Sequence, residues 1–145
     1  MLNERSRKQL AFEHCRLMNA GDVDGLLALY ADEVTFEDPV GSDRQSGRDA
    51  LRTHFGRAVA AGIHEAPGEP VACQDDVRVL IPVLAIMDYL PVGPDSVRRD
   101  RLTAPRNPEG RRLKRDSTLV LRTDEIGRIE ELKAYWGRSD LELIY

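Results

Sequence analysis

The sequence is poor in cysteine and lacks long apolar runs. Its two cysteines, Cys15 and Cys73, show neither the CxxC nor the Cys/His spacing of a metal site, so we interpret both as buried thiols and expect no metal. No apolar run approaches the roughly 20 residues that a membrane-spanning helix needs, and no apolar signal core follows the charged N-terminus. We therefore expect a cytoplasmic protein without a membrane segment.

An excess of positive charge is also absent. The formal net charge is -4, the sequence pI is near 5.4, and charges of both signs are mixed along most of the chain. Because nucleic-acid surfaces concentrate Lys and Arg, no nucleic-acid partner is expected. Without internal repeats, the 145 residues suit a single domain, residues 1–145, with one core.

Apolar residues at helical spacing predict three helices in the first part of the chain. The first covers residues 5–18, and the second, capped by Asp22, covers residues 23–30. The third covers residues 51–59 and follows a possible capping box at Ser46.

A short strand over residues 34–38 ends in an acid. Side chains alternate along a strand, so Val34, Phe36 and Asp38 share one face. Since Val34 and Phe36 are apolar, that face should meet the core, and Asp38 should point inward with them. The alternative is a surface acid that caps the turn before Pro39.

Four further strands are predicted at about residues 63–73, 77–89, 113–122 and 127–136. Pro82 suggests an edge or a bulge in the second of them. This order predicts an α+β fold in which three N-terminal helices pack on a strongly curved antiparallel sheet, a cone with an apolar pocket at its open end. The long connection over residues 90–112, rich in Pro and Arg, is either a flap over the pocket or disordered.

Residues 19–55, NAGDVDGLLALYADEVTFEDPVGSDRQSGRDALRTHF, strongly resemble the ketosteroid isomerase branch of the nuclear-transport-factor-2-like fold, to which SnoaL-like proteins belong. The resemblance implies that Asp38, the acid of EDPVGS, is the catalytic base. The position of the family's tyrosine oxyanion donor holds His14, and the second donor falls near Asp116 or Ser117. Strand alternation favours Ser117 inside, which argues against a normal isomerase donor pair.

A narrower resemblance is carried by EDPVG, GIHEAPGEPV, MDYLPVGP and AYWGRSDL. Together these segments look like the epoxide hydrolases and epoxide-opening cyclases of polyether ionophore biosynthesis, of the monensin and lasalocid type. That resemblance implies a polyketide substrate, no cofactor, and Asp38 and Glu65 facing each other across the pocket. It also implies a homodimer through the open sheet face, or a homologous partner hydrolase.

Epoxide opening by an internal hydroxyl needs a base on the nucleophile and an acid on the leaving oxygen. Two carboxyl groups with separated pKa values supply both. We assign Asp38 as the base and Glu65 as the acid. Glu69 competes with Glu65 for this role, and Asp88 and Asp116 are further acids that could replace it.

Other residues are expected to support the site rather than to carry the reaction. By the resemblance His14 points into the pocket, where it would orient the substrate, although a histidine on an apolar helix face is often a core residue. His54 is expected at the surface of its helix, and His64 should point away from Glu65. The predicted apolar wall of the pocket consists of Tyr30, Phe36, Phe55, Met87, Tyr135 and Trp136, and core packing is the alternative for most of them.

Two other function classes remain open. A steroid-type isomerase or a pyran-forming dehydratase-cyclase could use the same fold. A non-catalytic partner subunit is also possible, and acids that lie far apart or in solvent would favour it.

Overall fold

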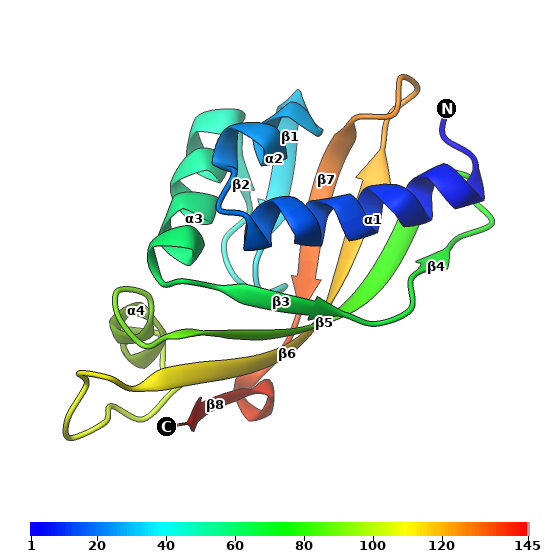
Figure 1. The fold of residues 1–145 in the computed structure, drawn as a ribbon. Helices are drawn as coiled ribbons and strands as arrows, with labels where there is room; N and C mark the ends of the chain where they lie inside the picture. Colours follow the sequence, from blue (N-terminus) through cyan, green and yellow to red (C-terminus); the bar gives the residue numbers. More distant parts are fainter. Residues whose placement is uncertain (145) are drawn as a thin grey trace.

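The fold consists of helices packed against one face of a curved sheet (Figure 1). The computed structural model describes residues 1–144. In chain order the elements are α1 (Glu4–Asn19), α2 (Val23–Ala28), β1 (Tyr30–Glu37), β2 (Gln45–Ser46), α3 (Arg48–Ala60), β3 (His64–Pro67), β4 (Val71–Ala72), β5 (Arg78–Asp88), α4 (Gly93–Arg98), β6 (Arg112–Thr123), β7 (Ile129–Tyr135), the 3-10 helix η1 (Arg138–Asp140) and β8 (Leu141–Ile144).

Three N-terminal helices are present as predicted, but the second is shorter than predicted: α2 ends at Ala28, and Tyr30 begins β1 instead of closing the helix. One capping prediction is also wrong. The carboxylate of Asp22 accepts a hydrogen bond from the backbone of Gly25 and so caps α2 as predicted. The capping box predicted at Ser46 is wrong, because α3 begins after Gly47 without a side-chain cap. Ser46 instead belongs to β2, where it pairs with Thr35 of β1.

The sheet is mixed, so the predicted purely antiparallel sheet is wrong at one pair of strands. Its order is β2-β1-β7-β6-β5-β3, with β4 beside β5 and β8 beside β6. Strands β1 and β7 pair in parallel, and the other strand pairs within residues 1–144 are antiparallel. Because β1 pairs with a strand far along the chain, no hairpin turn fixes their relative direction.

The strand predicted over residues 63–73 is two short strands, β3 and β4. Between them the backbone N–H of Gly68 donates to the carbonyl of Pro82 at 2.8 Å. The backbone N and O of a strand residue point to the same side, so the nitrogen of Pro82, which carries no hydrogen, also faces the gap between β3 and β4. Here the three residues 68–70 stand opposite the two residues 81–82, so the irregularity beside Pro82 lies in the neighbouring segment, and the β5–β6 register stays regular on either side of Pro82.

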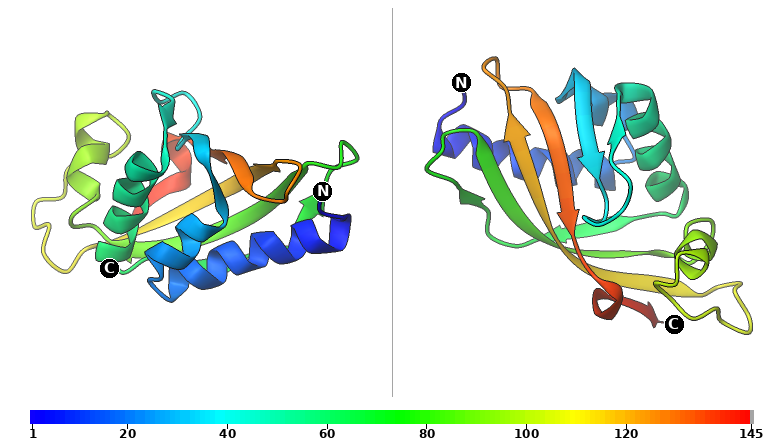
Figure 2. Two further views of the ribbon diagram at one scale, coloured as in Figure 1. Left: turned by 90° about the horizontal axis from the view of Figure 1, so that it is seen from above. Right: turned by 180° about the vertical axis from the view of Figure 1, so that it is seen from behind.

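The core lies between the helices and the concave face of the sheet. Figure 2 shows α1, α2 and α3 on one side of the sheet and its other face without a covering helix. Alternate residues of β5 and β6 are buried on the inner side. Cys15 is buried as predicted, whereas Cys73 is only partly buried, so the interpretation of both thiols as buried is wrong for Cys73. Within residues 1–144 no helix is both long enough and apolar enough to cross a bilayer.

The connection over residues 90–112 contains α4 and packs against the rest of the fold. Gly93 lies directly against the ring of Tyr89, where a Cβ atom would have no room. Further on, the Arg101 guanidinium donates to the hydroxyl of Ser42 at 3.0 Å. The segment therefore lies beside the turn that follows β1, which favours the flap over the disordered alternative.

Candidate active site

Asp38 lies just after β1, on the inner face it shares with Val34 and Phe36. Its side chain is 11% exposed, and both carboxylate oxygens are hydrogen-bonded. His54 Nε2 lies 2.8 Å from Oδ2, and the indole N–H of Trp136 donates to Oδ1 at 2.7 Å. Burial alone would raise the pKa of Asp38, but the His54 hydrogen bond, the charges of Arg115 and His54 and the Trp136 hydrogen bond hold it well below its ordinary value. Asp38 is therefore ionised at neutral pH.

The histidine beside Asp38 is His54, so its predicted place at the helix surface is wrong. The His54 ring packs at centroid distances of 5.4 Å from Phe36 and 5.9 Å from Phe55. The sequence did contain the signal, because Leu51 and His54 are three residues apart on one helical stripe. The rotation of α3 about its axis decides that this stripe, His54 included, faces the sheet.

Glu65 is buried on β3, with 4% of the residue exposed. Its Oε1 has no hydrogen-bond partner in the described part of the chain. The Cys15 thiol is hydrogen-bonded to the carboxyl group. Burial is the main cause that raises the pKa of Glu65 to about 7; the charge of Arg115 and the Cys15 hydrogen bond lower it, and the charge of Asp38 raises it further. Below about pH 7 Glu65 therefore carries a proton.

The Glu65 backbone is fixed by Asn19 at the end of α1. The Glu65 N–H donates to Asn19 Oδ1 at 2.6 Å, and Asn19 Nδ2 donates to the Glu65 carbonyl at 2.8 Å. The Asn19 amide thus satisfies the backbone N–H and C=O groups that a neighbouring strand would otherwise pair with. It also fixes the position of the Glu65 backbone relative to α1.

Below about pH 7 the two acids are in opposite protonation states, with Asp38 ionised and Glu65 protonated. The charge of Asp38 acts on Glu65, and both charges act on the phenol of Tyr30, whose pKa is raised well above its ordinary value mainly by burial. Both acids are largely buried, whereas acids in solvent would favour a non-catalytic subunit.

His14 contacts Tyr30 rather than Asp38. His14 Nε2 and the Tyr30 hydroxyl are 2.6 Å apart, and both rings pack edge-on or tilted against Phe55. Burial lowers the pKa of His14 to about 4, so the imidazole is neutral, and its Nδ1 has no partner within residues 1–144. The supporting role expected for His14, that of orienting the substrate at the catalytic site, stays a prediction, and its observed contact is with the Tyr30 hydroxyl.

The residues predicted to line the pocket are buried to different extents. Tyr30, Phe36, Phe55 and Met87 belong to the core and are at most 3% exposed, whereas Trp136 is half-buried. Substrate binding by these five residues stays a prediction. Tyr135 is 45% exposed and lies on the outer face of β7, so its place in the predicted wall is wrong.

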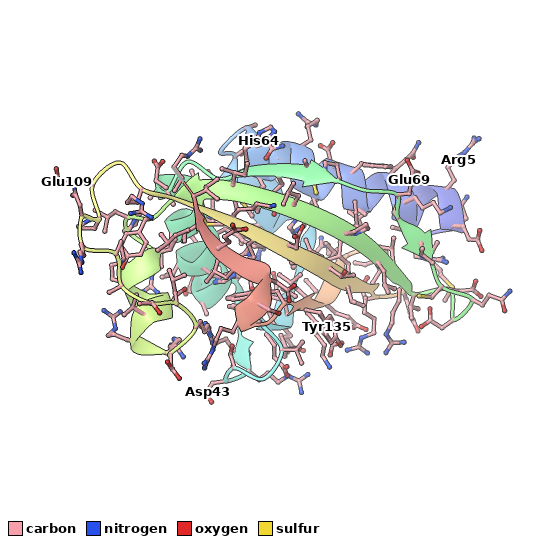
Figure 3. All side chains as sticks on the ribbon, turned by 90° about the horizontal axis from the view of Figure 1, so that it is seen from below. Arg5, Asp43, His64, Glu69, Glu109 and Tyr135 are labelled. Atoms are coloured by element: carbon pink, nitrogen blue, oxygen red, sulfur yellow. The ribbon has the colours of Figure 1, made fainter. Side chains whose placement is uncertain are left out.

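The competing acids lie in solvent. Asp88 is exposed and forms an ion pair with Arg112, and Asp116 points to the outer face of β6. Glu69 is exposed as well, as is His64, and Figure 3 shows the labelled side chains of Glu69 and His64 along the outside of the molecule. Strand alternation explains these positions, because Ser117, next to Asp116, is buried on the inner side as predicted.

Two arginines that the sequence analysis did not assign to the site lie against the Trp136 ring. The guanidinium carbon of Arg101 lies 5.4 Å from the Trp136 ring centroid, and that of Arg115 lies 5.1 Å from it. Both distances are within cation–π range. The indole bound to Asp38 is therefore flanked by two positive charges.

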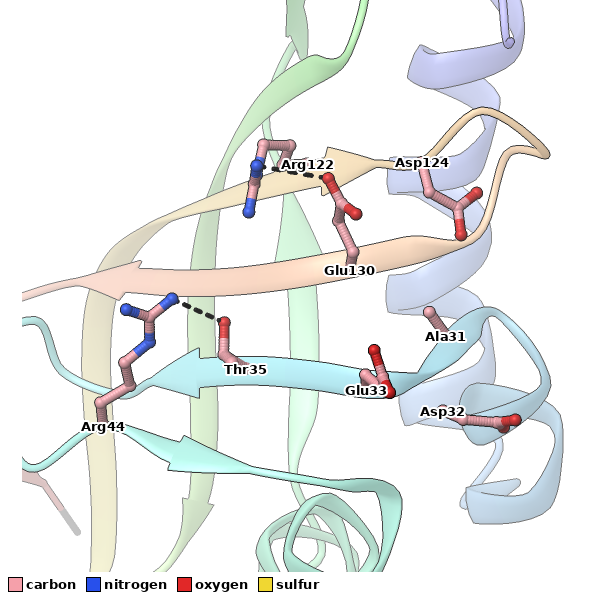
Figure 4. Close-up of a pocket in the computed structure, with 8 residues that line it drawn as sticks. All are labelled: Ala31, Asp32, Glu33, Thr35, Arg44, Arg122, Asp124 and Glu130. Carbon is pink, nitrogen blue, oxygen red and sulfur yellow. Dashed lines mark hydrogen bonds and ion pairs between the residues drawn. The ribbon is translucent and has the colours of Figure 1, made fainter.

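A hollow of about 430 Å³ on the outer face of the sheet is separate from these acids (Figure 4). Its lining is mostly polar and comprises Ala31, Asp32, Glu33, Thr35, Arg44, Arg122, Asp124 and Glu130. No group of three or more His, Cys, Asp or Glu side chains in residues 1–144 is arranged to hold a metal ion. The buried carboxyl pair is thus the stronger candidate for a reactive site.

Comparison with known proteins places the chain in a family. A model of the SnoaL-like domain matches residues 11–132. The chain is 44% identical over 144 residues, 98% of its length, to the epoxide hydrolase LasB from Streptomyces lasalocidi, and it spans about half (51%) of that relative. The solved structure of SalBIII superposes with a TM-score of 0.82 at 30% identity, over 99% of this chain and 100% of that one. SalBIII is described as an epoxide hydrolase/cyclase-like enzyme with a role in pyran ring formation in the polyether salinomycin. The resemblance seen in residues 19–55 is thereby confirmed: this chain belongs to the family of SnoaL-like domains.

Proposed function

We propose that this chain is a cofactor-independent epoxide hydrolase/cyclase that opens epoxides of a polyepoxide polyketide with an internal hydroxyl group and so forms cyclic ether rings. The observation that carries this proposal is the pair of coupled inner-face carboxyl groups, Asp38 ionised and Glu65 protonated. An ionised base and a protonated acid are the two partners that the reaction needs. The similarity to an epoxide hydrolase and to an epoxide hydrolase/cyclase-like enzyme supports the same reaction.

In the proposed step Asp38 accepts the proton of the attacking hydroxyl group. The hydroxyl oxygen forms a bond to one epoxide carbon, the bond from that carbon to the epoxide oxygen breaks, and Glu65 gives its proton to that oxygen. No electron is gained or lost overall. Asp38 ends protonated and Glu65 ionised, so proton exchange with solvent must restore both before the next turnover.

Substrate positioning is assigned to the aromatic and apolar residues of the inner face. Tyr30, Phe36, Phe55, Met87 and Trp136 would hold the apolar chain in one conformation, and His14 would act through the Tyr30 hydroxyl. A fixed conformation favours attack at one of the two epoxide carbons, and a barrier difference of about 1.4 kcal/mol already gives tenfold selectivity in ring size.

The test is turnover of a short bisepoxide with a free hydroxyl group, with the product identified by mass and NMR. Asp38→Asn and Glu65→Gln should each lower kcat by about 10²-fold or more, because each removes one proton-transfer partner. The exposed acids provide matched controls, and Asp88→Asn and Glu69→Gln should keep wild-type rates. Activity retained in a folded Asp38→Asn or Glu65→Gln variant would contradict the assignment.

Pyran formation by a dehydratase-cyclase is the second candidate, and the likeness to SalBIII favours it. The same acid and base would then remove water and close the ring, so the product would be lighter than the substrate by one water. Epoxide opening by an internal hydroxyl leaves the mass unchanged. A steroid-type isomerase would instead shift the absorbance of an enone in the absence of any epoxide.

We further propose that the protein acts in the cytoplasm as a homodimer that pairs through the outer face of the sheet. A second hollow of about 610 Å³ on that face includes Leu84, Thr118 and Tyr135. Asp140 of the 3-10 helix η1 lines part of it, no described α-helix covers it (Figure 2), and 45% of Tyr135 is exposed there. A homologous partner hydrolase could occupy the same face.

A further inference from the structure

Arg115 is a positively charged residue on the inner face of the sheet. Inward-facing residues of β6 alternate with outward-facing ones, and Leu113, Ser117 and Leu119 are the buried members of this series. Arg115 stands between Leu113 and Ser117 in the same alternation, so its side chain leaves the strand toward the helices rather than toward solvent. A strand arginine in this position is unusual, because arginine seldom occupies an inner face without a carboxylate partner.

Strand register brings Arg115 to Glu65 across one small residue. Glu65 of β3 pairs with Ala85 of β5, and Ala85 pairs with Arg115 of β6. The three residues form one row across the inner face. Because the Ala85 side chain is a single methyl group, the long side chains on either side can approach each other above it, and the charge of Arg115 acts on the Glu65 carboxyl group.

The guanidinium of Arg115 also reaches the other acid. It lies over the Trp136 ring, whose N–H is bound to Asp38, and its charge helps to lower the pKa of Asp38. Yet no carboxylate oxygen in residues 1–144 lies within 4.0 Å of the Arg115 nitrogens, and its buried Nε has no hydrogen-bond partner there. The free chain therefore holds an unpaired cation between its two acids.

From its place in the row with Ala85 and Glu65 and from its contact with Trp136, we propose that Arg115 is a further catalytic residue, whose guanidinium binds the departing epoxide oxygen beside the Glu65 carboxyl group. This inference rests on the proposed function. As the carbon–oxygen bond of the epoxide breaks, its electron pair moves onto the epoxide oxygen and negative charge develops there. A preorganised N–H donor with a positive charge stabilises that charge, and the Glu65 proton then completes the hydroxyl group.

The absence of a carboxylate within ion-pair distance of Arg115 in residues 1–144 is what distinguishes this role from structural neutralisation of Asp38. Asp38 already has two hydrogen-bond donors, His54 and Trp136, so it does not need Arg115 as a partner. The neighbouring cation, Arg101, is engaged by the Ser42 hydroxyl. Five other titratable or charged side chains surround Arg115, Asp38 and Glu65. They are His14 and Cys15 from α1, Tyr30 from β1, His54 from α3 and Arg101 after α4.

The experiment compares Arg115→Met, Arg115→Lys and the outer-face control Arg122→Met in steady-state turnover of the hydroxy-bisepoxide across a pH series. Arg115→Met should lower kcat by about 10²- to 10³-fold with little change in KM, since charge develops only in the transition state. Arg115→Lys should lose about tenfold, because it keeps the charge but not the planar donors. Arg122→Met should keep the wild-type rate.

The pH profile is a second readout that a merely structural role would not move. Loss of the Arg115 charge should raise the pKa of Glu65, so the basic limb of the Arg115→Met profile should shift upward by about one pH unit. Arg115→Lys should leave that limb in place. If circular dichroism shows that Arg115→Met is unfolded, the tenfold loss of kcat in Arg115→Lys becomes the test, and an unchanged kcat in that variant would overturn the inference. An active wild type with kcat in Arg115→Met unchanged within threefold would overturn this inference alone. A wild type inactive on every epoxide would overturn the proposed function, and this inference with it.

Discussion

At the scale of single residues, two carboxyl groups of similar intrinsic acidity behave in opposite ways because their neighbours differ. Asp38 has hydrogen-bond donors on both oxygens, whereas Glu65 has a buried oxygen without any in the described chain. Donors stabilise the ionised form, and apolar burial stabilises the neutral form. The protonation states follow from these local contacts.

Glu65→Gln should change how stability depends on pH. The folded-state pKa of Glu65, about 7, lies above its ordinary value of 4.5, so the folded protein binds an extra proton between these pH values. The free energy of unfolding of the wild type should therefore fall as pH rises through this window, by on the order of 3 kcal/mol at about 1.4 kcal/mol per pKa unit. The glutamine variant should lack this slope and be the more stable protein at pH 8.

Urea unfolding of both proteins over a pH series measures this difference. Glu69→Gln, which changes an exposed residue four positions away, should follow the wild-type curve. Parallel curves for the wild type and Glu65→Gln would show that Glu65 ionises in the fold as easily as in the unfolded chain.

His54→Leu should move the acid limb of the kcat/KM profile to higher pH. The imidazole lowers the pKa of Asp38 through a hydrogen bond and through its charge, so its loss raises that pKa toward the ordinary value. Less Asp38 is then ionised in mild acid, and activity there falls while activity at neutral pH is reduced less. His64→Leu, an exposed histidine, is the control, and an acid limb that does not move would contradict the assignment of His54.

The acids of the site could be predicted from the sequence, but their partners could not. Period-two alternation places Asp38 with Phe36, and the quoted motifs single out Glu65. Arg115 also fits that alternation, yet an arginine in a strand is ordinarily read as a surface residue, and only the register across Ala85 brings it to Glu65. His54 depends in the same way on the rotation of α3.

At the scale of elements, a buried arginine ties the start of α1 to the turn between β4 and β5. The fully buried Arg7 guanidinium donates to the carbonyl oxygens of Leu2, Cys73, Asp76 and Arg78. These carbonyls belong to chain ends and a turn, where regular sheet partners are missing. Arg7 satisfies them together.

Arg7→Met should lower the free energy of unfolding by about 3 kcal/mol, because it leaves four buried or half-buried carbonyl groups without their donor. Chemical denaturation measures the change. Arg5→Met alters an exposed arginine of the same helix and should stay within about 0.5 kcal/mol of the wild type. Equal stabilities of the two variants would mean that water replaces the guanidinium at no cost.

Long elements were predictable, and short ones and their partners were not. The predicted strands over residues 77–89 and 113–122 match β5 and β6 within one residue, because apolar alternation persists over many positions. Strands β2, β4 and β8 have two to four residues and carry no such signal. The parallel pairing of β1 with β7 is a property of the chain path between them.

At the scale of the whole molecule, the sheet has one face covered by helices and one without. The outer face carries charged pairs, such as Arg122 with Glu130, together with apolar side chains such as Leu84 and Tyr135. The sequence predicts this two-sidedness, since alternation separates the faces, but it does not say what meets the uncovered one.

Leu84→Glu should convert the proposed homodimer to a monomer, because the substitution places an unpaired charge in the lining of the 610 Å³ hollow on the outer face. Size-exclusion chromatography with light scattering measures the mass directly. Val71→Glu, an exposed position on the short strand β4, should leave the dimer intact. A wild-type protein that elutes with the mass of a single chain would contradict the dimer.

The Asn19 clamp on Glu65 has a consequence for the solubility of the protein. Strand β3 is the last in the sheet, and an edge strand with free N–H and C=O groups is a template for edge-to-edge aggregation. Asn19 already occupies both groups of Glu65 at the middle of this edge. An incoming strand would have to displace that amide and then meet Pro67, which has no N–H to offer, so the contact that positions the candidate acid also keeps the sheet from growing.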